Sequence, residues 1–286
     1  MGAGPGTGSG AGSDADAGSS GASASPSAAS SPAWLPTGFV TLVRREVQRF
    51  LRRPKNTFVP PFVTNVLYFS VFGVILGQRI EAINGVPYVL FILPGLVVLG
   101  AISNAFENAS FSIFHGRWNR YIEEPLTSPL SYTQMAAAYV VAGATRGLLV
   151  GVLVAAVGAV FTDVGAARPF YLVAFALVVT GLFAAIGVVG GLWADDWDDL
   201  TMLNQFIVRP LVFFGGVFYS IGELPPLFRT ASLLNPMVYM VNGVRYGFLG
   251  QSEIDPNASL AVLTGLLVAT LALDAYLFER GYGLTE

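Results

Sequence analysis

The stretch LLNPMVYMVNGVRYGFLG, residues 233–250, decides how the rest of this chain is interpreted. It is too apolar for a hydrophilic loop, yet Pro236 near its start and Asn242 and Arg245 further on make it a poor membrane span. One apolar stripe at helical spacing is formed by Met237, Val241, Val244 and Phe248. Asn242 and Arg245 are then expected to face water or lipid headgroups. The stretch predicts a helical segment that lies at the membrane without crossing it.

The composition around this stretch indicates a lipid environment. Hydrophobic residues make up 53% of the chain, charged residues only 12%, and the mean hydropathy is +0.62. Cysteine is absent, which excludes disulfides and thiolate chemistry, and His115 alone cannot build a multi-histidine metal site. A net charge of -3 argues against nucleic-acid binding, which needs a basic surface.

Six apolar segments have about the 20 residues that a helix needs to cross a bilayer. They are residues 57–77, 88–106, 133–161, 169–193, 200–220 and 258–278. The second is the weakest, because Asn104, Glu107 and Asn108 make its end polar. The sequence therefore predicts an all-α integral membrane protein with six transmembrane helices.

Two different segments precede the first span. Residues 1–37 are almost entirely Gly, Ala, Ser and Pro and predict a disordered tail, because they bury too little apolar surface to fold. Residues 39–53 instead predict an amphipathic basic helix that Pro54 ends. Its apolar stripe is Phe39, Val43, Val47 and Phe50. Arg45, Arg49 and Arg52 lie on the other side, so the helix is expected to rest in the membrane interface with these arginines at the headgroups.

The distribution of basic residues predicts the orientation. Most of them flank the first span, the loop between the second and third spans, and the end of the last span. These flanks all fall on one side of the membrane, so both termini are expected to be cytoplasmic in a multi-pass protein of the cell membrane.

The longest expected cytoplasmic loop is FHGRWNRYIEEPLTSPLSYTQ, residues 114–134. A short helix is expected over residues 114–124, because Pro125 disfavours helix at the residue before it. Ser131 is the expected N-cap of the third span. The residues of this loop that are candidates for contact with a partner are Arg117, Trp118, Arg120, Glu123 and Glu124. A solvated connector is an equally good interpretation of this loop.

Motifs for enzymatic chemistry are absent from the sequence. There is no GxxxxGK[ST] phosphate loop, and the only lysine, Lys55, lies in RRPKN. There is also no HExxH or GxSxG motif. The chain is therefore expected to bind no cofactor and to have no ATP site of its own.

Two long stretches resemble the permeases of the ABC-2 type transporters. RYIEEPLTSPLSYTQMAAAYVVAGATRGLLVG, residues 120–151, resembles their cytoplasmic loop and third span. RPLVFFGGVFYSIGELPPLFRTASLLNPMVYMVNGVRYGFLG, residues 209–250, resembles their fifth span and the external segment after it. With the basic helix and the six spans, the resemblance covers residues 38–286. It is nearest to the group that exports drugs, antibiotics and lipo-oligosaccharides.

This resemblance implies a fold, partners and site residues. The basic helix would be a cytoplasmic elbow helix, and short external re-entrant helices between spans five and six would contain Asn235, Pro236, Asn242 and Arg245. A separate ATPase subunit holding ATP and Mg would press on the 114–128 loop and the elbow helix. Two permease copies, as a homodimer, would export an amphipathic or lipid-linked drug, antibiotic, lipid or saccharide. Pro125 departs from the family, which often has a hydrophobic residue there.

Polar residues inside the spans have two interpretations. Arg146 lies near the middle of the third span and Arg209 in the fifth, and a central arginine costs about 2.5–3.5 kcal/mol on insertion scales. Such a residue either lines a substrate pathway or forms a structural pair, for example with Glu107 or a backbone carbonyl. An ion-gradient-driven carrier or channel would need more paired ionisable groups, usually in repeated halves. A non-transporting membrane scaffold is a third class that the sequence leaves open.

Overall fold

The structure is a computed structural model that describes Gly2 and residues 37–80 and 82–284. The tail expected over residues 1–37 falls almost wholly outside the described residues. The side chain of Arg209 is also outside the described part, so both of its interpretations, a pathway lining and a structural pair, stay predictions.

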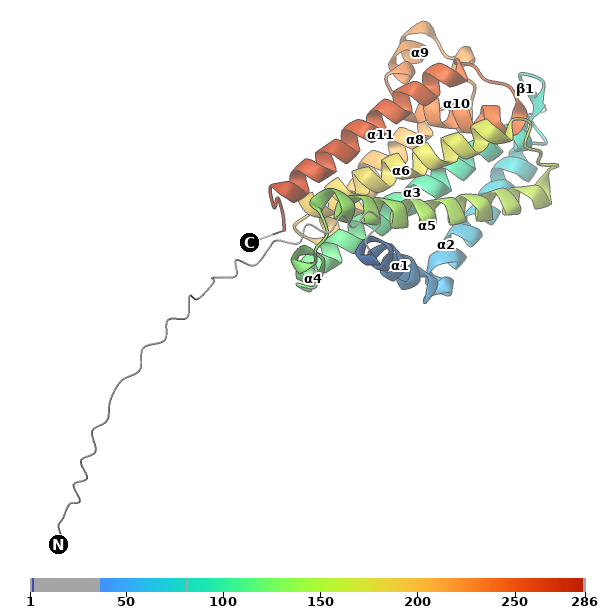
Figure 1. Cartoon of the computed structure of the whole chain (residues 1–286). Helices are drawn as coiled ribbons and strands as arrows, with labels where there is room; N and C mark the ends of the chain where they lie inside the picture. Colours follow the sequence, from blue (N-terminus) through green and yellow to red (C-terminus); the bar gives the residue numbers. More distant parts are fainter. Residues whose placement is uncertain (1, 3–36, 81, 285–286) are drawn as a thin grey trace. The chain divides into compact units, whose positions relative to one another are not determined.

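Five helices among the described residues are long and apolar enough to cross a membrane. They are Pro54–Leu76, which combines α2 (Pro54–Tyr68) with the π-helical η1 (Phe69–Leu76), and α3 (Tyr88–Trp118), α5 (Tyr132–Phe161), α6 (Pro169–Trp193) and α11 (Pro256–Glu279). They lie side by side in a bundle (Figure 1). The described chain is thus a helical multi-pass membrane protein.

The expected fifth span, residues 200–220, is not one long helix. The backbone is helical through α7 (Trp197–Met202), the π-helical η2 (Leu203–Val208) and α8 (Arg209–Phe213), and then turns. Pro210 lies in the first turn of α8. Gly216, at φ +76°, lets the chain bend just after α8 ends. This stretch is too short to count with the five long helices, so the sixth span remains a prediction.

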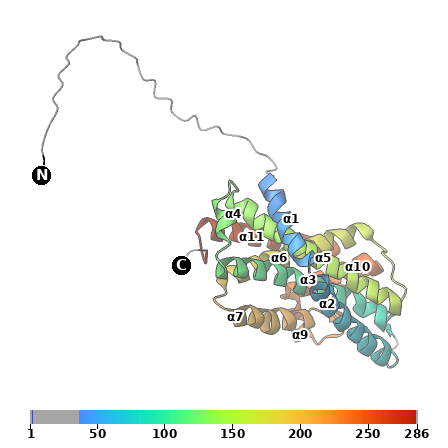
Figure 2. The ribbon, with the colours of Figure 1, turned by 90° about the horizontal axis from the view of Figure 1, so that it is seen from below.

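Two sets of short elements lie at opposite ends of the bundle (Figure 1). At one end α1 (Thr37–Leu51) runs across the direction of the long helices, beside α4 (Glu123–Thr127) (Figure 2). At the other end lie η3 (Ile221–Glu223), α9 (Pro226–Leu233), the start of α10 (Pro236–Leu249) and a two-stranded hairpin. The hairpin pairs β1 (Ala82–Ile83) with β2 (Val86–Pro87) through Asn84 and Gly85, both at positive φ as a tight hairpin turn requires.

Helix α3 is the centre of the bundle and packs against α5, α6 and α10. Small residues allow these helices to approach closely, as is typical of membrane helix interfaces. A Cβ placed at Gly187 of α6 would lie 2.6 Å from the carbonyl oxygen of Phe106, and one at Gly147 of α5 would lie 2.7 Å from that of Ala101. These two glycines therefore hold α5 and α6 against the backbone of α3.

The second span is longer than the predicted one. It was expected to end at residue 106, but α3 continues to Trp118. Its polar residues do not end the helix because their side chains have partners: Asn104 Nδ2 donates to the carbonyl of Gly100 at 3.0 Å, and Glu107 pairs with Arg146 of α5.

The loop after α3 also differs from the prediction of a helix over residues 114–124. The first part of that range belongs to α3, and the short helix is α4, Glu123–Thr127, with Pro125 inside it. Proline is tolerated there because N–H groups in the first turn of a helix have no intrahelical acceptor. The predicted N-cap at Ser131 is confirmed, since its hydroxyl accepts from Gln134 N in a capping box.

Candidate functional site

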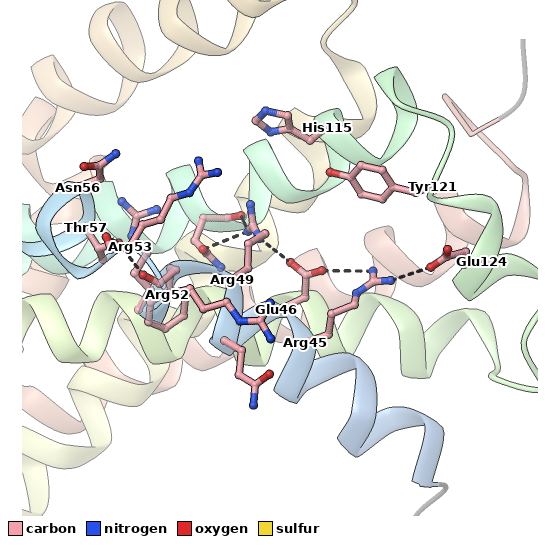
Figure 3. A pocket seen from close by; sticks show the side chains of 14 residues that line it. Arg45, Glu46, Arg49, Arg52, Arg53, Asn56, Thr57, His115, Tyr121 and Glu124 are labelled. Atoms are coloured by element: carbon pink, nitrogen blue, oxygen red, sulfur yellow. Dashed lines mark hydrogen bonds and ion pairs between the residues drawn. The ribbon is translucent and has the colours of Figure 1, made fainter.

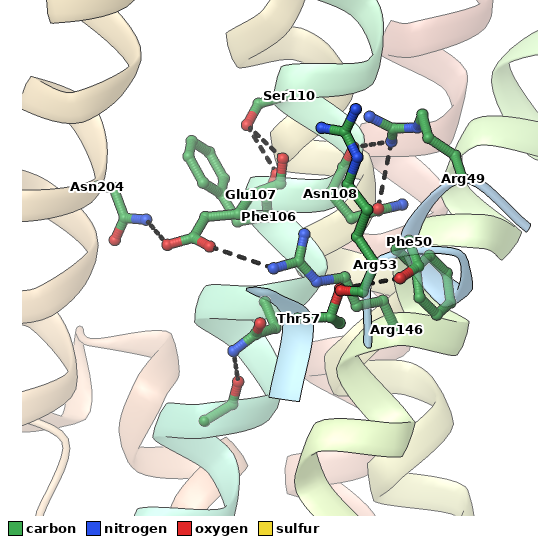
Figure 4. Close-up of polar contacts among 12 residues, drawn as sticks. Arg49, Phe50, Arg53, Thr57, Phe106, Glu107, Asn108, Ser110, Arg146 and Asn204 are labelled. Carbon is green, nitrogen blue, oxygen red and sulfur yellow. Dashed lines mark hydrogen bonds and ion pairs between the residues drawn. The ribbon is translucent and has the colours of Figure 1, made fainter. Parts of the chain in front are cut away.

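A polar junction joins three helices inside the bundle (Figure 4). Glu107 of α3 pairs with Arg146 of α5 at 3.7 Å and accepts from Nδ2 of Asn204 of η2 at 3.1 Å. Both members of the ion pair are less than one third exposed. Of the interpretations that the sequence left open for Arg146, the structure shows the pair with Glu107, and it adds Asn204, which the sequence interpretation missed.

This junction borders a polar groove of about 310 Å³ between α2 and α3. Several polar atoms around it have no hydrogen-bond partner in the described part of the chain: Asn65 Oδ1, Arg146 Nε and Asn204 Oδ1. Unpaired polar groups in an apolar medium cost free energy, so they call for water or a ligand. The groove lies between helices that are long enough to cross the membrane, so it is a candidate pathway for a polar group of a substrate.

A second cavity, which we call the arginine pocket, lies between α1, the start of α2, α3 and α4 (Figure 3). Its volume is about 770 Å³. Five arginines contribute to its lining: Arg45, Arg49, Arg52, Arg53 and Arg146. Asn56, Thr57 and Arg146 also line the polar groove, so the two cavities adjoin.

Glu46 is the buried centre of α1, and the sequence interpretation missed it. It is 4% exposed and pairs with Arg49 at 3.1 Å and Arg45 at 3.3 Å, and it accepts a hydrogen bond from Ser112 of α3. The buried face of α1 is Leu42, Glu46 and Phe50. The spacing of four residues between these three positions was the signal, because it places an acid within an apolar stripe.

The arginines predicted as elbow anchors have different environments. Arg49 donates through Nη2 to both the carbonyl and the Oδ1 of Asn108, each at 3.2 Å, and Arg45 reaches Glu124 of α4 at 3.4 Å. Arg52 makes no ion pair with a described residue. Two of the three therefore join α1 to α3 and α4, which was not expected of residues at the headgroups. Partial burial raises the pKa of the nearby Tyr121 phenol above its ordinary value.

One residue of the predicted contact loop, Arg117, anchors it to α6, and the other four candidates are exposed. Arg117 donates through Nη1 to the carbonyls of Gly191, Leu192 and Ala194 at 2.8–2.9 Å, and so satisfies the C-terminal end of α6. Trp118, Arg120, Glu123 and Glu124 are exposed. Trp118, Arg120 and Glu123 line a cavity of about 740 Å³ together with Asp195, Gly283 and Leu284, whereas Glu124 lines the arginine pocket.

The expectation that Asn242 and Arg245 face water is wrong. Helix α10 is buried on several faces, with Asn242 1% and Arg245 4% exposed. Asn242 accepts from Glu253 N at 2.8 Å and donates to the carbonyl of Ile254 at 3.0 Å. Arg245 donates to the carbonyl of Gly216 at 2.7 Å and lies over the ring of Phe91 at 3.9 Å.

The start of α10 is held in a similar way. Asn235 caps the helix through Met237 N at 3.0 Å and donates to the carbonyl of Leu211 in α8 at 2.8 Å, while Pro236 occupies the first turn. The polar residues of this segment thus fasten α10 to α8 and to the following loop.

These features define a multi-pass membrane protein in which the arginine pocket and the polar groove adjoin within the helical bundle; we call these two cavities together the polar seam. Residues 37–249 match the ABC-2 type transporter family, and the chain belongs to that family. It is similar to the inner membrane transport permease YadH of Escherichia coli (strain K12), with 40% identity over 241 residues that cover 84% of this chain and 94% of the relative. It is also similar to nodulation protein J of Rhizobium leguminosarum bv. trifolii, with 26% identity over 75% of this chain and 82% of the relative. Nodulation protein J of Sinorhizobium fredii (strain NBRC 101917 / NGR234) shows 26% identity over 86% of this chain and 94% of the relative.

Proposed function

We propose that this chain is the permease subunit of an ATP-binding cassette exporter that moves an amphipathic substrate out of the cytoplasm. Two copies of the chain would work with two separate ATPase subunits, which would bind ATP and Mg. Membership of the ABC-2 family supports the transport role. The concentration of basic residues on α1, at the same end of the bundle as α4, supports cytoplasmic termini.

The polar seam supports a pathway for the substrate. The arginine pocket adjoins the polar groove through residues that line both cavities. A substrate with a polar end and an apolar body would place its polar end against Glu107, Arg146 and Asn204. Its apolar body would contact the exposed apolar face of α2, where Val59, Phe62 and Val63 are about half exposed.

The observation that carries the proposal is the connection between α4 and this seam. The single helix α3 runs from the Glu107 junction to Trp118, and α4 is fixed to its end because Ile122 N donates to the carbonyl of Gly116 at 3.0 Å. Glu124 adds a link to α1 through Arg45. A push on α4 would therefore be transmitted to both cavities, which is the kind of coupling that an ATPase-driven switch between two states requires.

Charge reversal on α4 tests this coupling. We expect Glu123→Arg combined with Glu124→Arg to abolish ATP-dependent transport while membrane insertion and thermal stability remain, because both carboxylates are exposed. The measurement is copurification of the ATPase from the native membrane, followed by ATP-dependent transport in vesicles. Since Glu124 also pairs with Arg45, the single variant Glu123→Arg separates partner contact from the link to α1.

Glu223→Arg is the matched control, because Glu223 is exposed and belongs to η3 at the other end of the bundle. It should leave both measurements unchanged. Unchanged transport in the α4 variants would refute the coupling site. A chain that purifies alone and moves solute without ATP would favour a gradient-driven carrier, and one with no transport at all would favour a scaffold.

A further inference from the structure

The arginine pocket has a strong excess of positive charge. Its lining contains five arginines and two glutamates, Glu46 and Glu124. Glu46 is shared between two arginines, Glu124 pairs with Arg45, and Arg146 pairs with Glu107 of the adjoining groove. Within the described chain, Arg52 and Arg53 have no acidic partner. Because low-dielectric walls focus the field of such a cluster, the pocket attracts anions.

The buried polar atoms of the arginine pocket that lack a hydrogen-bond partner in the part of the chain that the structure describes are both nitrogen donors. Asn108 is 2% exposed and lines the pocket, and its Oδ1 is occupied by Arg49. Its Nδ2 has no hydrogen-bond partner among the described residues, and neither has Nε of Arg146. A buried N–H group without an acceptor costs free energy, so a ligand rich in oxygen acceptors would be stabilised here.

These two observations select one ligand chemistry. A group that is both anionic and able to accept several hydrogen bonds matches guanidinium and amide donors, and phosphate has this combination. We propose that the arginine pocket binds an anionic phosphate group. The inference goes beyond the proposed function and does not rest on it, because the binding requires neither an ATPase nor transport.

The phosphate has two potential sources, a lipid headgroup and a soluble phosphate compound. The surroundings of the pocket favour the lipid. Val40 and Leu51 of α1 and Val59 of α2 are 45–55% exposed, and they belong to the same two helices as many of the pocket-lining residues. A lipid could place its headgroup among the arginines while its acyl chains lie along α2.

Lipid binding by the detergent-purified full chain tests the proposal. The probes are phosphatidylglycerol, zwitterionic phosphatidylcholine and inorganic phosphate, and native mass spectrometry measures the fraction bound. We expect phosphatidylglycerol to bind at least about 10-fold more tightly than phosphatidylcholine, as one well-placed charge-assisted contact provides. Arg52→Gln with Arg53→Gln should weaken it about 10-fold or more, and both residues are exposed, so the variant should fold.

The control is Arg44→Gln with Lys55→Gln. It removes two positive charges from the same part of the chain, but neither residue lines the pocket. Affinity close to that of the unmodified chain in this control supports the site. Equal losses in the two double variants would show general attraction to the basic segment and would overturn it. Binding of inorganic phosphate that displaces phosphatidylglycerol would assign the site to a soluble phosphate, and binding of neither probe would refute the proposal.

Discussion

Gly187→Val is expected to destabilise this protein more than most single substitutions. A Cβ at this position would lie 2.6 Å from the carbonyl oxygen of Phe106 and 3.1 Å from the Cβ of Ala109, both on α3. Since the first of these is a backbone atom, α6 would have to move away from the central helix. We expect a loss of at least about 3 kcal/mol in the free energy of unfolding, at the upper end of overpacking effects. Thermal unfolding in detergent, followed by fluorescence-detected gel filtration, measures it.

Gly265→Val is the matched control. Gly265 also lies within a long apolar helix, α11, but a Cβ there would meet no atom within 4 Å. Its melting temperature should stay within a few degrees of the unmodified protein. If Gly187→Val unfolds at the same temperature as Gly265→Val, the close packing of α6 on α3 does not determine stability.

Glu107→Leu is expected to have the second large effect. It leaves Arg146 without its carboxylate at 3.7 Å and Asn204 without its acceptor at 3.1 Å. Removing one member of a buried ion pair costs about 3–5 kcal/mol, and we expect the low end because the groove keeps both side chains partly exposed. The same thermal unfolding measurement applies, together with the amount of protein inserted in the membrane.

The double variant Glu107→Leu with Arg146→Met separates a structural role from a transport role. Replacing both charges by apolar side chains should recover most of the stability, because no charge is left unpaired. If the junction handles the substrate, transport stays lost in this variant. Recovery of transport as well as stability would assign the pair to structure alone. Equal stability of Glu107→Leu and the unmodified chain would show that the pair contributes nothing.

Much of the fold was predictable because bilayer-spanning helices are encoded locally. Five of the expected spans correspond to long helices, since each needs only a run of apolar residues of sufficient length. The Ser131 cap was also predictable, because capping depends on residues three apart. The fifth span was not, because its apolar composition does not show that the helix is interrupted before Gly216.

The candidate site was predictable only in part. The sequence identified Arg146 as a costly residue within a span, but it left open whether Arg146 lines a pathway or pairs with Glu107 or a carbonyl, and it assigned Glu107 to the end of a span. The polar residues of α10 were assigned to the surface, and the structure buries them against loop carbonyls. The spacing of Glu46 from Leu42 and Phe50 indicated its burial, but nothing near it in the sequence shows that Ser112, on α3, is its partner.

The sequence by itself determined that this chain is a helical membrane protein and where most of its spans lie, because these depend on composition and on the length of apolar runs. It also indicated the family, through the two long stretches that resemble ABC-2 permeases. Only the tertiary structure decided which polar groups are paired and which are left open. Glu107, Arg146 and Asn204 come from three helices, and the arginine pocket forms where α1, α2, α3 and α4 meet. A buried polar group is stable only with a partner, and that partner is chosen by packing between segments distant in the chain.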